Sequence, residues 1–350
     1  MSITITAPGR VNLIGEHTDY NGGWVLPAAL AVSLSVTLAP RSGDQISVTA
    51  DVFGGQVRRR LNDAAAGHWS DPAVGALREA NTLGLLTGGA DLSITSTIPA
   101  GSGLSSSAAL IVAILKAARG IAGSDISDTA IAVAARRVEN DYIGVPCGIM
   151  DQMAVAVAAP GEAMALDTAT LDYRVVSLPR SHSMAVIHSG HTRQLTDGRY
   201  AARKEECDAA KAVFATNDLC QLIPEEIEAL VRIDPVLKRR TRHCATEHRR
   251  VLAAVEALEA GHIDGFGQLM IGSHASMRDD FDITIPPIDA LVSDAVQFGA
   301  AGARMTGGGF GGCIVACVEC GIREEWQAQL LAAHPRARFI DAVDARIAPS

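Results

Sequence analysis

The sequence predicts an α+β protein with two lobes. Its 350 residues exceed what one hydrophobic core usually organises, because domains average about 150 residues. Apolar residues make up 48% of the chain and charged residues 20%, so the chain can bury sizeable cores. Strand-like runs dominate its beginning, helical periodicity dominates its middle, and its end mixes both. This grouping is typical of an α+β fold rather than of repeated βαβ units.

The first lobe opens with strands, because residues 3–57 alternate β-branched runs with Gly and Pro turns. Helical spacing of apolar residues follows, and Ser127 is placed to cap a helix. The expected elements, in order, are strands at 3–7, 25–39 and 45–53, a helix at 69–86, a strand at 90–98, a helix at 105–121, and a helix after Ser127.

The boundary between the lobes is expected near Pro179, which follows the segment 164–176. We therefore expect lobes at residues 1–178 and 179–350. The second lobe should contain a strand at 184–190, helices within 199–261, a helix after Pro286, a strand at 313–318, a helix through Leu331 and a strand at 338–343.

The charge of the chain argues against polyanionic partners. Lys and Arg number 30 and Asp and Glu 39, which gives a formal charge of −9. The one concentrated basic run, between Lys238 and Arg250, falls on an expected helix, and we interpret it as a solvated face that also carries Glu247 and Glu256. Aromatic residues are only 4% of the chain, which leaves few platforms for stacking bases. No nucleic-acid partner is expected.

Membrane insertion and export are not expected either. No apolar stretch approaches the roughly 20 residues that span a bilayer, and the N-terminus has no charged and then apolar leader. Seven cysteines, an odd number and mostly far apart, indicate reduced thiols rather than a disulfide framework. We therefore expect a cytoplasmic monomer without a membrane partner.

Three of the cysteines have a spacing that needs an explanation. Cys313, Cys317 and Cys320 form C-x3-C-x2-C, which is similar to the cluster-binding triplet of radical S-adenosylmethionine enzymes. Strand alternation in this apolar run would place Cys313 and Cys317 on one face and Cys320 on the other. We expect buried core thiols, and a cluster enzyme remains an alternative.

The strongest local signal is IPAGSGLSSSAAL, in which a strand leads through glycines into a helix opened by serines. Glycines let backbone N–H groups approach an anion, and the helix N-terminus adds partial positive charge. A P-loop is absent, because no Lys follows the glycines. The expected phosphate-binding residues are Gly101, Ser102, Gly103, Leu104, Ser105, Ser106 and Ser107.

A second glycine cluster, MTGGGFGGC, contains G-x-G-x-x-G at Gly307, Gly309 and Gly312. A Rossmann fingerprint needs a strand before the glycines and a helix after them, whereas an apolar strand follows here. We therefore interpret the cluster as a flexible loop that closes a site from the second lobe.

Polar residues crowd the N-terminus between Arg10 and Asn21, among several glycines. Carboxylates, an imidazole and amides on one turn can bind several hydroxyl groups, although polar turns are also common on surfaces. Glu139 and Asp151 follow at the end of one predicted helix and in the next segment. One of these carboxylates could hold a metal and the other could accept a proton.

Together these stretches resemble the GHMP kinases, and galactokinases among them. APGRVNLIGEHTDYNGG resembles the galactokinase signature, IPAGSGLSSSAAL the family's phosphate motif, and RMTGGGFGGC its third motif. GVPCGIMDQ, TDGRYAARKEEC and SHASMRDDFDIT are similar to further galactokinase segments in the family order.

The resemblance implies a role for each matching residue. Arg10 would stabilise the transferring phosphoryl group, Asp151 would act as catalytic base, and Ser107 and Glu139 would hold Mg²⁺, while the glycine-serine loop would bind ATP. The implied sugar contacts are Glu16, His17, Thr18, Asp19, Gly148, Asp151 and Tyr200.

The resemblance also implies a ribosomal-protein-S5-like α/β N-terminal lobe, a ferredoxin-like C-terminal lobe and a site in the cleft between them. The expected activity is Mg²⁺-dependent and ATP-dependent phosphorylation of the anomeric hydroxyl of galactose, the first phosphorylation step of galactose catabolism. Two alternatives stay open: a sensor that binds galactose and ATP without turnover, and a kinase for a related sugar such as an N-acetylated galactose.

Overall fold

The computed structural model describes residues 1–350 except 53, 100, 193–197, 231 and 346–350. The chain forms two compact units that are not continuous in sequence. The first unit contains residues 1–10, 31–100 and 104–159, and the second contains residues 11–30, 101–103 and 160–350. Each unit combines helices with β-strands, so the predicted α+β class is confirmed. The predicted division after residue 178 stays a prediction.

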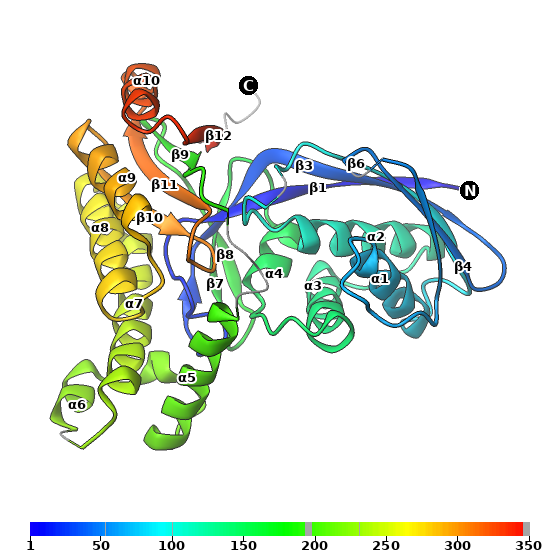
Figure 1. Cartoon of the computed structure of the whole chain (residues 1–350), viewed down its shortest axis with the longest axis horizontal. Coiled ribbons are helices and arrows are strands. Elements are labelled where there is room, and N and C mark those ends of the chain that lie inside the picture. The colour runs from blue at the N-terminus through cyan, green and yellow to red at the C-terminus, as the bar shows by residue number, and fades with distance from the viewer. Residues whose placement is uncertain (53, 100, 193–197, 231, 346–350) are drawn as a thin grey trace. The chain divides into compact units, whose positions relative to one another are not determined.

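In the first unit, helices cover one face of a sheet (Figure 1). Strand β6 lies between β3 and β4, antiparallel to β3 and parallel to β4, while β1 pairs with β3 and β5 forms the edge beside β4. The elements that lie wholly or mostly in this unit are β1 (Ile3–Asn12), β3 (Pro27–Pro40), β4 (Gln45–Ala50), β5 (Gln56–Arg60), β6 (Ala90–Ser96), α1 (Asp71–Thr82), α2 (Ser106–Ala122), α3 (Asp128–Arg137), a π-helical turn (Val138–Ile143) and α4 (Met150–Val157).

Helix α2 is the centre of this unit's core. Its residues 108–115 are all buried, because the helix is apolar around its whole circumference. The predicted helix at 105–121 is confirmed to within one residue at each end. Ser127 caps α3 as predicted, since its Oγ accepts a 3.1 Å hydrogen bond from the N–H of Ala130. No helix in the described ranges is long and apolar enough to cross a membrane.

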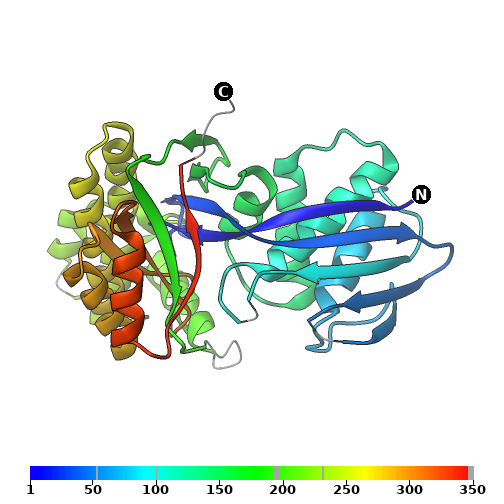
Figure 2. The same cartoon turned by 90° about the horizontal axis from the view of Figure 1, so that it is seen from above.

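The second unit contains a four-stranded antiparallel sheet with helices gathered on one side (Figure 2). The strand order is β10–β11–β9–β12, with β9 (His182–His188), β10 (Gly302–Thr306), β11 (Cys313–Glu319) and β12 (Arg338–Val343). Strand β7 (Ala163–Asp167) lies between β2 (Trp24–Val25) and β8 (Tyr173–Val176) in the same unit. The helices are α5 (Arg199–Phe214), a 3-10 turn (Leu219–Gln221), α6 (Pro224–Ala229), α7 (Pro235–Glu259), α8 (Ile263–Asp279), α9 (Pro286–Gln297) and α10 (Arg323–Ala333).

Several elements were not predicted, among them β5, β10 and α8. Strand β5 carries three consecutive arginines and β10 is interrupted by Arg304, so neither has an unbroken apolar pattern. Helix α8 contains Gly265, Gly267 and Gly272, and glycine lowers helix propensity by about 1 kcal/mol relative to alanine. Tertiary packing overrides these local signals, because residues of β10 and α8 lie in the core of the second unit.

The cysteine triplet is divided between the core and the surface. Cys313 and Cys317 are buried within β11, and Cys320 is exposed just after the strand. The Cys320 thiol lies 3.6 Å from the carbonyl oxygen of Arg180. Burial raises the pKa of Cys317 to about 12, so this thiol stays protonated near neutral pH. Cys313 and Cys317 therefore lie together in the core as packing residues, apart from Cys320, as strand alternation predicts.

The interpretation of the basic helix as a solvated face was wrong for several of its residues. On α7, Arg240 and His243 are buried together with Glu247, whose carboxylate is fully enclosed. Charged neighbours and hydrogen bonds lower the pKa of Glu247 to about 2 despite the opposing effect of burial. The sequence pattern did not separate these residues from exposed Arg249, because a charged helix face can bind other side chains as well as water.

His243 makes the second unit sensitive to acid. Burial, the largest effect, lowers the pKa of His243 from 6.5 to about 4, and burial also lowers the pKa of His274. The unfolded chain binds a proton on His243 below pH 6.5, whereas the folded chain does so only near pH 4. This contribution to stability is therefore complete above pH 6.5 and is lost as the pH falls toward 4.

We expect the free energy of unfolding to fall between pH 6.5 and pH 4, by up to about 1.4 kcal/mol per pH unit for each such histidine. Urea titrations at several pH values measure this slope. His243→Gln should be less stable at pH 7 but should show a smaller slope, because one titrating group is gone. An unchanged slope in a folded variant would contradict this assignment to His243.

Candidate active site

A bidentate ion pair fixes Asp151 in the first unit. Arg10 lies near the end of β1 and is 5% exposed. Its Nε donates to Oδ1 of Asp151 at 2.8 Å and its Nη2 donates to Oδ2 at 2.7 Å. The Asp151 side chain, in the first turn of α4, is 31% exposed and thus accessible to a ligand. Two parallel charge-assisted hydrogen bonds set the plane of the carboxylate.

Ser105 contacts the same carboxylate. Its Oγ donates to Oδ2 of Asp151 at 2.6 Å, although Ser105 is the N-cap residue of α2 and its hydroxyl would ordinarily cap the helix. Its φ of 63° is unusual for a non-glycine residue and aims the side chain away from the capping position. No local sequence pattern indicates this contact, because the two residues are separated by 46 positions. The predicted ATP contact of Ser105 stays a prediction.

The start of α2 retains the features of an anion site. Ser106 is exposed and Ser107 half-buried in its first turn, while Leu104 is buried and its carbonyl oxygen accepts from the N–H of Arg10 at 3.3 Å. The unpaired N–H groups of a helix's first turn favour a phosphate there. Gly101, Ser102 and Gly103, the preceding residues of the predicted loop, belong to the second unit.

In the second unit these three residues adjoin the second glycine cluster. The thiol of Cys313 lies 3.3 Å from the carbonyl oxygen of Ser102. The cluster forms a loop from β10 to β11, in agreement with the expected order of elements. A Cβ on Gly309 would lie 2.7 Å from the Ile283 side chain, so glycine is required where this loop crosses Ile283.

Glu139 and Ser107, the predicted metal ligands, are neighbours in the first unit, where the Ser107 hydroxyl favours the ionised form of Glu139 and so acts to lower its pKa. Glu139 lies on the π-helical turn after α3, a geometry that is frequent at functional sites. Gln152 donates from Nε2 to Glu139, and the Cys147 thiol lies 3.6 Å from the same carboxylate. Burial raises the pKa of Glu139, and the negative charge of Asp151 raises it further.

The residues around Glu139 fit a hard cation. A carboxylate and a hydroxyl are oxygen ligands of the kind that Mg²⁺ prefers. The Oε1 of Gln152 is buried and has no hydrogen-bond partner among the described residues. One more oxygen acceptor is therefore available beside Glu139. A cation near Glu139 would also offset the repulsion between this carboxylate and Asp151.

Glu16, a predicted sugar contact, is held in the second unit by three hydrogen bonds. Its Oε1 accepts from Nη1 of Arg304 at 3.3 Å and from the N–H of Gly307 at 2.8 Å. Its Oε2 accepts from Nδ2 of Asn12 at 2.9 Å. The Glu16 carboxylate therefore connects the turn that follows β1 to the loop that follows β10.

His17 lies in an aromatic cluster on the same turn. Its Nδ1 is 2.6 Å from the hydroxyl of Tyr20, and its ring centroid is 5.2 Å from that of Tyr200 and 4.6 Å from that of Phe281. Burial, with smaller contributions from neighbouring groups, raises the pKa of Tyr20 well above its usual value. Tyr200, on α5, is thus brought to the N-terminal turn from a position far along the chain.

The remaining predicted sugar contacts differ in their surroundings. Asp19 is half-buried beside Tyr20. The hydroxyl of Thr18 lies 2.8 Å from the carbonyl oxygen of Trp24 and 3.0 Å from that of Gly15, so its proton serves the turn itself. Gly148 is buried in the loop before α4, in the first unit with Asp151. Thr196 and Asp197, at the start of the predicted segment around Tyr200, lie outside the described residues.

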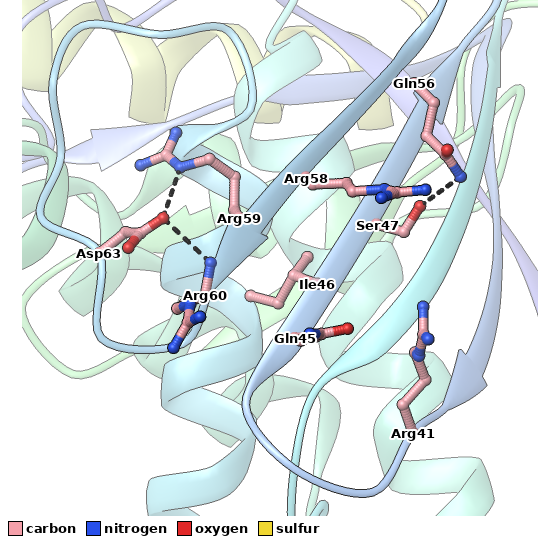
Figure 3. A pocket seen from close by; sticks show the side chains of 9 residues that line it. All are labelled: Arg41, Gln45, Ile46, Ser47, Gln56, Arg58, Arg59, Arg60 and Asp63. Atoms are coloured by element: carbon pink, nitrogen blue, oxygen red, sulfur yellow. Dashed lines mark hydrogen bonds and ion pairs between the residues drawn. The ribbon is translucent and has the colours of Figure 1, made fainter.

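A cavity of about 470 Å³ in the first unit is separate from these residues (Figure 3). It lies over β4 and β5, and none of the predicted site residues lines it. Three of its arginines already have carboxylate partners: Arg59 pairs with Asp63 and Asp71, Arg41 with Asp91, and Arg60 with Asp44. The cavity is therefore close to neutral and does not compete with the start of α2 as a phosphate site.

Sequence reasoning missed Arg304 and Glu247 as parts of the site. Both are fully buried and both bind the turn around Glu16, Arg304 through the Glu16 carboxylate and Glu247 through the N–H of Gly15. A charged residue inside the otherwise apolar strand GARMT was the available signal for Arg304. No sequence signal singles out Glu247, because it is one charged residue among many on α7.

Comparisons with known proteins match the chain from end to end. The family model described as galactokinase galactose-binding signature matches residues 2–40, the GHMP kinases N terminal domain matches residues 70–159, and the GHMP kinases C terminal model matches residues 254–330. The structure of Lactococcus lactis galactokinase complexed with galactose is 31% identical, with a TM-score of 0.92 over 97% of this chain and 93% of that chain.

More distant structures share the fold alone. Mevalonate kinase from Methanococcus jannaschii is 19% identical, with a TM-score of 0.71 over 99% of each chain. Phosphomevalonate kinase from Streptococcus pneumoniae is 14% identical, with a TM-score of 0.73 over 97% of this chain and 99% of that chain. The galactose-binding signature at the N-terminus and the 31% identity over nearly the whole chain show that this protein belongs to the galactokinases of the GHMP kinase family.

Proposed function

We propose that this ATP-dependent sugar kinase phosphorylates the anomeric hydroxyl of galactose, with Asp151 as proton acceptor. The observation that carries the proposal is the bidentate pair between Arg10 and Asp151 beside the start of α2. The pair combines an acceptor for a hydroxyl proton with a cation for phosphoryl charge, next to backbone N–H groups suited to a phosphate.

Asp151 is held by protein donors and still accessible. Nη2 of Arg10 lies 2.7 Å from both carboxylate oxygens, Nε of Arg10 and Oγ of Ser105 each donate to one of them, and the side chain is 31% exposed. The exposed part of this carboxylate could accept the proton of a sugar hydroxyl as its oxygen attacks the γ-phosphoryl group of ATP. Because the transition state for phosphoryl transfer is largely loose, orientation of the hydroxyl by Asp151 matters as much as proton removal.

Arg10 and the start of α2 would offset the negative charge on the phosphoryl group. Ser107 and Glu139 would hold Mg²⁺, and Gln152, which donates to Glu139, would keep that carboxylate in place. A bound Mg²⁺ would neutralise charge on the phosphate oxygens. The proposed ATP contacts are the loop residues Gly101, Ser102, Gly103, Leu104, Ser105, Ser106 and Ser107.

Galactose would be recognised by the polar turn. Glu16, His17, Thr18, Asp19 and Tyr200 belong to the second unit, and Gly148 and Asp151 to the first. Carboxylates and an imidazole suit a hydroxyl-rich ring, because a buried acceptor left unpaired by the wrong epimer carries a free-energy penalty.

The proposal is tested with a panel of sugars, ATP and Mg²⁺, in which ADP release is measured and the new phosphate is located by NMR. We expect galactose to be phosphorylated at its anomeric oxygen and EDTA to abolish the reaction. Galactose binding without ADP release would indicate the sensor, and preferred turnover of N-acetylated galactose would indicate the related kinase. Either outcome would contradict the proposal.

Asp151→Asn preserves the shape of the side chain but removes its negative charge. We expect kcat to fall by roughly 10²-fold to 10⁴-fold, with only a moderate change in galactose affinity, because the amide cannot take up the hydroxyl proton. Steady-state kinetics and calorimetric binding of galactose separate the two effects. The matched control is Asp91→Asn, which breaks an exposed 2.9 Å ion pair with Arg41 in the same unit and should leave kcat unchanged.

Asp19→Ala tests how the sugar is selected. Galactose and glucose differ in the direction of one hydroxyl group, and hydrogen bonds to such a group can support preferences up to roughly 10⁴-fold. We expect the variant to lose kcat/KM steeply for galactose and much less for glucose, so the ratio should shrink. Exposed Asp172 provides the control substitution Asp172→Ala. Equal losses for both sugars would show that Asp19 holds the turn rather than reads the hydroxyl.

A further inference from the structure

Four side chains of alternating charge form a series in the second unit, and all but Arg250 are buried. Arg250 Nε lies 2.7 Å from Oε2 of Glu247, and Oε1 of Glu247 lies 3.7 Å from Nη2 of Arg304. Arg304 Nη1 in turn lies 3.3 Å from Oε1 of Glu16. The Glu247 and Arg304 side chains are 0% exposed and that of Glu16 is 2% exposed. The series joins α7 and β10 to the turn after β1.

Stability alone is a weak explanation for this series. Removing a charge from water costs several kcal/mol, and well-packed apolar residues often stabilise a core as well as a buried ion pair does. Its two positive and two negative side chains give the series no net charge, so it needs no further charged partner. Its arrangement is better explained by what it holds in place.

Arg304 is the centre of the series, and each part of its guanidinium has a partner. Nε donates to Ser273 Oγ at 3.0 Å, and Nη1 donates both to Glu16 and, at 3.2 Å, to the carbonyl oxygen of Asn12. Nη2 lies 3.4 Å from the sulfur of Met277 and faces Glu247. A planar fork with five N–H donors can satisfy these directions together, whereas a lysine cannot.

Glu247 supports Arg304 and the turn at once. Its Oε1 accepts from the hydroxyl of Ser273 at 2.5 Å and from the N–H of Gly15 at 3.0 Å. Gly15, with a φ of 104°, precedes Glu16 directly. The backbone before Glu16 and the carboxylate of Glu16 are therefore both bound by the same buried pair.

These bonds determine which oxygen of Glu16 is left for a ligand. Oε1 accepts from Arg304 and from Gly307, so both of its acceptor positions are used. Oε2 accepts only from Asn12 among the described residues, which leaves one position. One sugar hydroxyl can donate there, in a direction that the fixed carboxylate sets.

We propose that Arg304, backed by Glu247 and Ser273, is a positioning residue that aims Oε2 of Glu16 at a hydroxyl of the sugar. The inference rests on the proposed sugar contact of Glu16. Arg304 does not touch the substrate in this scheme. It occupies Oε1, and it thereby makes Glu16 a single directed acceptor instead of a mobile anion.

The test is Arg304→Lys, which keeps the charge but loses the fork. We expect galactose affinity, measured by calorimetry without nucleotide, to fall roughly 10-fold to 100-fold, because small misplacements of a binding group have effects of this size. Affinity for a non-hydrolysable ATP analogue should change by less than about 2-fold, within the range of indirect surface effects. Urea titration of each variant reports stability separately. A folded variant with unchanged galactose affinity would overturn the positioning role.

Two further variants keep the test decisive. Arg59→Lys is the matched control, since it alters another ion-paired arginine, bound to Asp63 and Asp71, away from the turn; it should lose stability without losing galactose affinity. Ser273→Ala removes the hydroxyl shared by Arg304 and Glu247 without removing a charge, and it applies even where Arg304→Lys does not fold. We expect galactose affinity to fall by about 3-fold to 10-fold in Ser273→Ala, because two hydrogen bonds to charged groups are lost and act on the sugar only through Arg304 and Glu16.

A double-mutant cycle with Glu16→Gln separates this inference from the proposed function. Coupled residues give non-additive losses, so the double variant should bind galactose hardly worse than Glu16→Gln alone. Additive losses would overturn the positioning role and leave the sugar contact of Glu16 intact. Unchanged galactose affinity in Glu16→Gln itself would remove Glu16 from the sugar site, and the positioning role with it.

Discussion

The arrangement of the first unit's chemistry depends on the two parallel hydrogen bonds between Arg10 and Asp151. They join the end of a strand to the first turn of α4. Ser105 adds a third bond at the start of α2, and the N–H of Arg10 binds the carbonyl oxygen of Leu104. A carboxylate, a guanidinium and a helix N-terminus are thus fixed to one another, which is the preorganisation that the proposed phosphoryl transfer would need.

The second unit orients a carboxylate in the same way. In the first unit a surface-accessible carboxylate is oriented by a buried arginine, and in the second the buried Arg304 orients the carboxylate of Glu16. In both cases protein donors occupy most of the carboxylate's acceptor positions. Orientation by a guanidinium fork gives a carboxylate a defined direction, which binding to an asymmetric sugar requires.

Sequence patterns failed where a polar or charged residue can bind either its own helix or solvent, or instead a side chain far along the chain. Ser127 and Ser105 both precede a helix, yet Ser127 caps α3 while Ser105 binds Asp151 instead. Arg249 and Glu247 both belong to one charged stretch of α7, yet the first is exposed and the second is fully buried. Local spacing describes which groups are present, but the partner of a polar group lies elsewhere in the chain.

The sequence by itself determined the α+β class, most elements and the identity of the glycine-serine loop, because these follow from short-range periodicity and from residues with special backbone properties. Its motifs also singled out Arg10, Glu16, Glu139 and Asp151 as candidate site residues, which stay predictions. Only the tertiary structure decided that Ser105 binds Asp151, that Gln152 holds Glu139, and that Arg304 and Glu247 hold the turn of Glu16. The physical reason is that these pairs are up to 288 positions apart, and a buried charge finds its partner only when packing brings the two together.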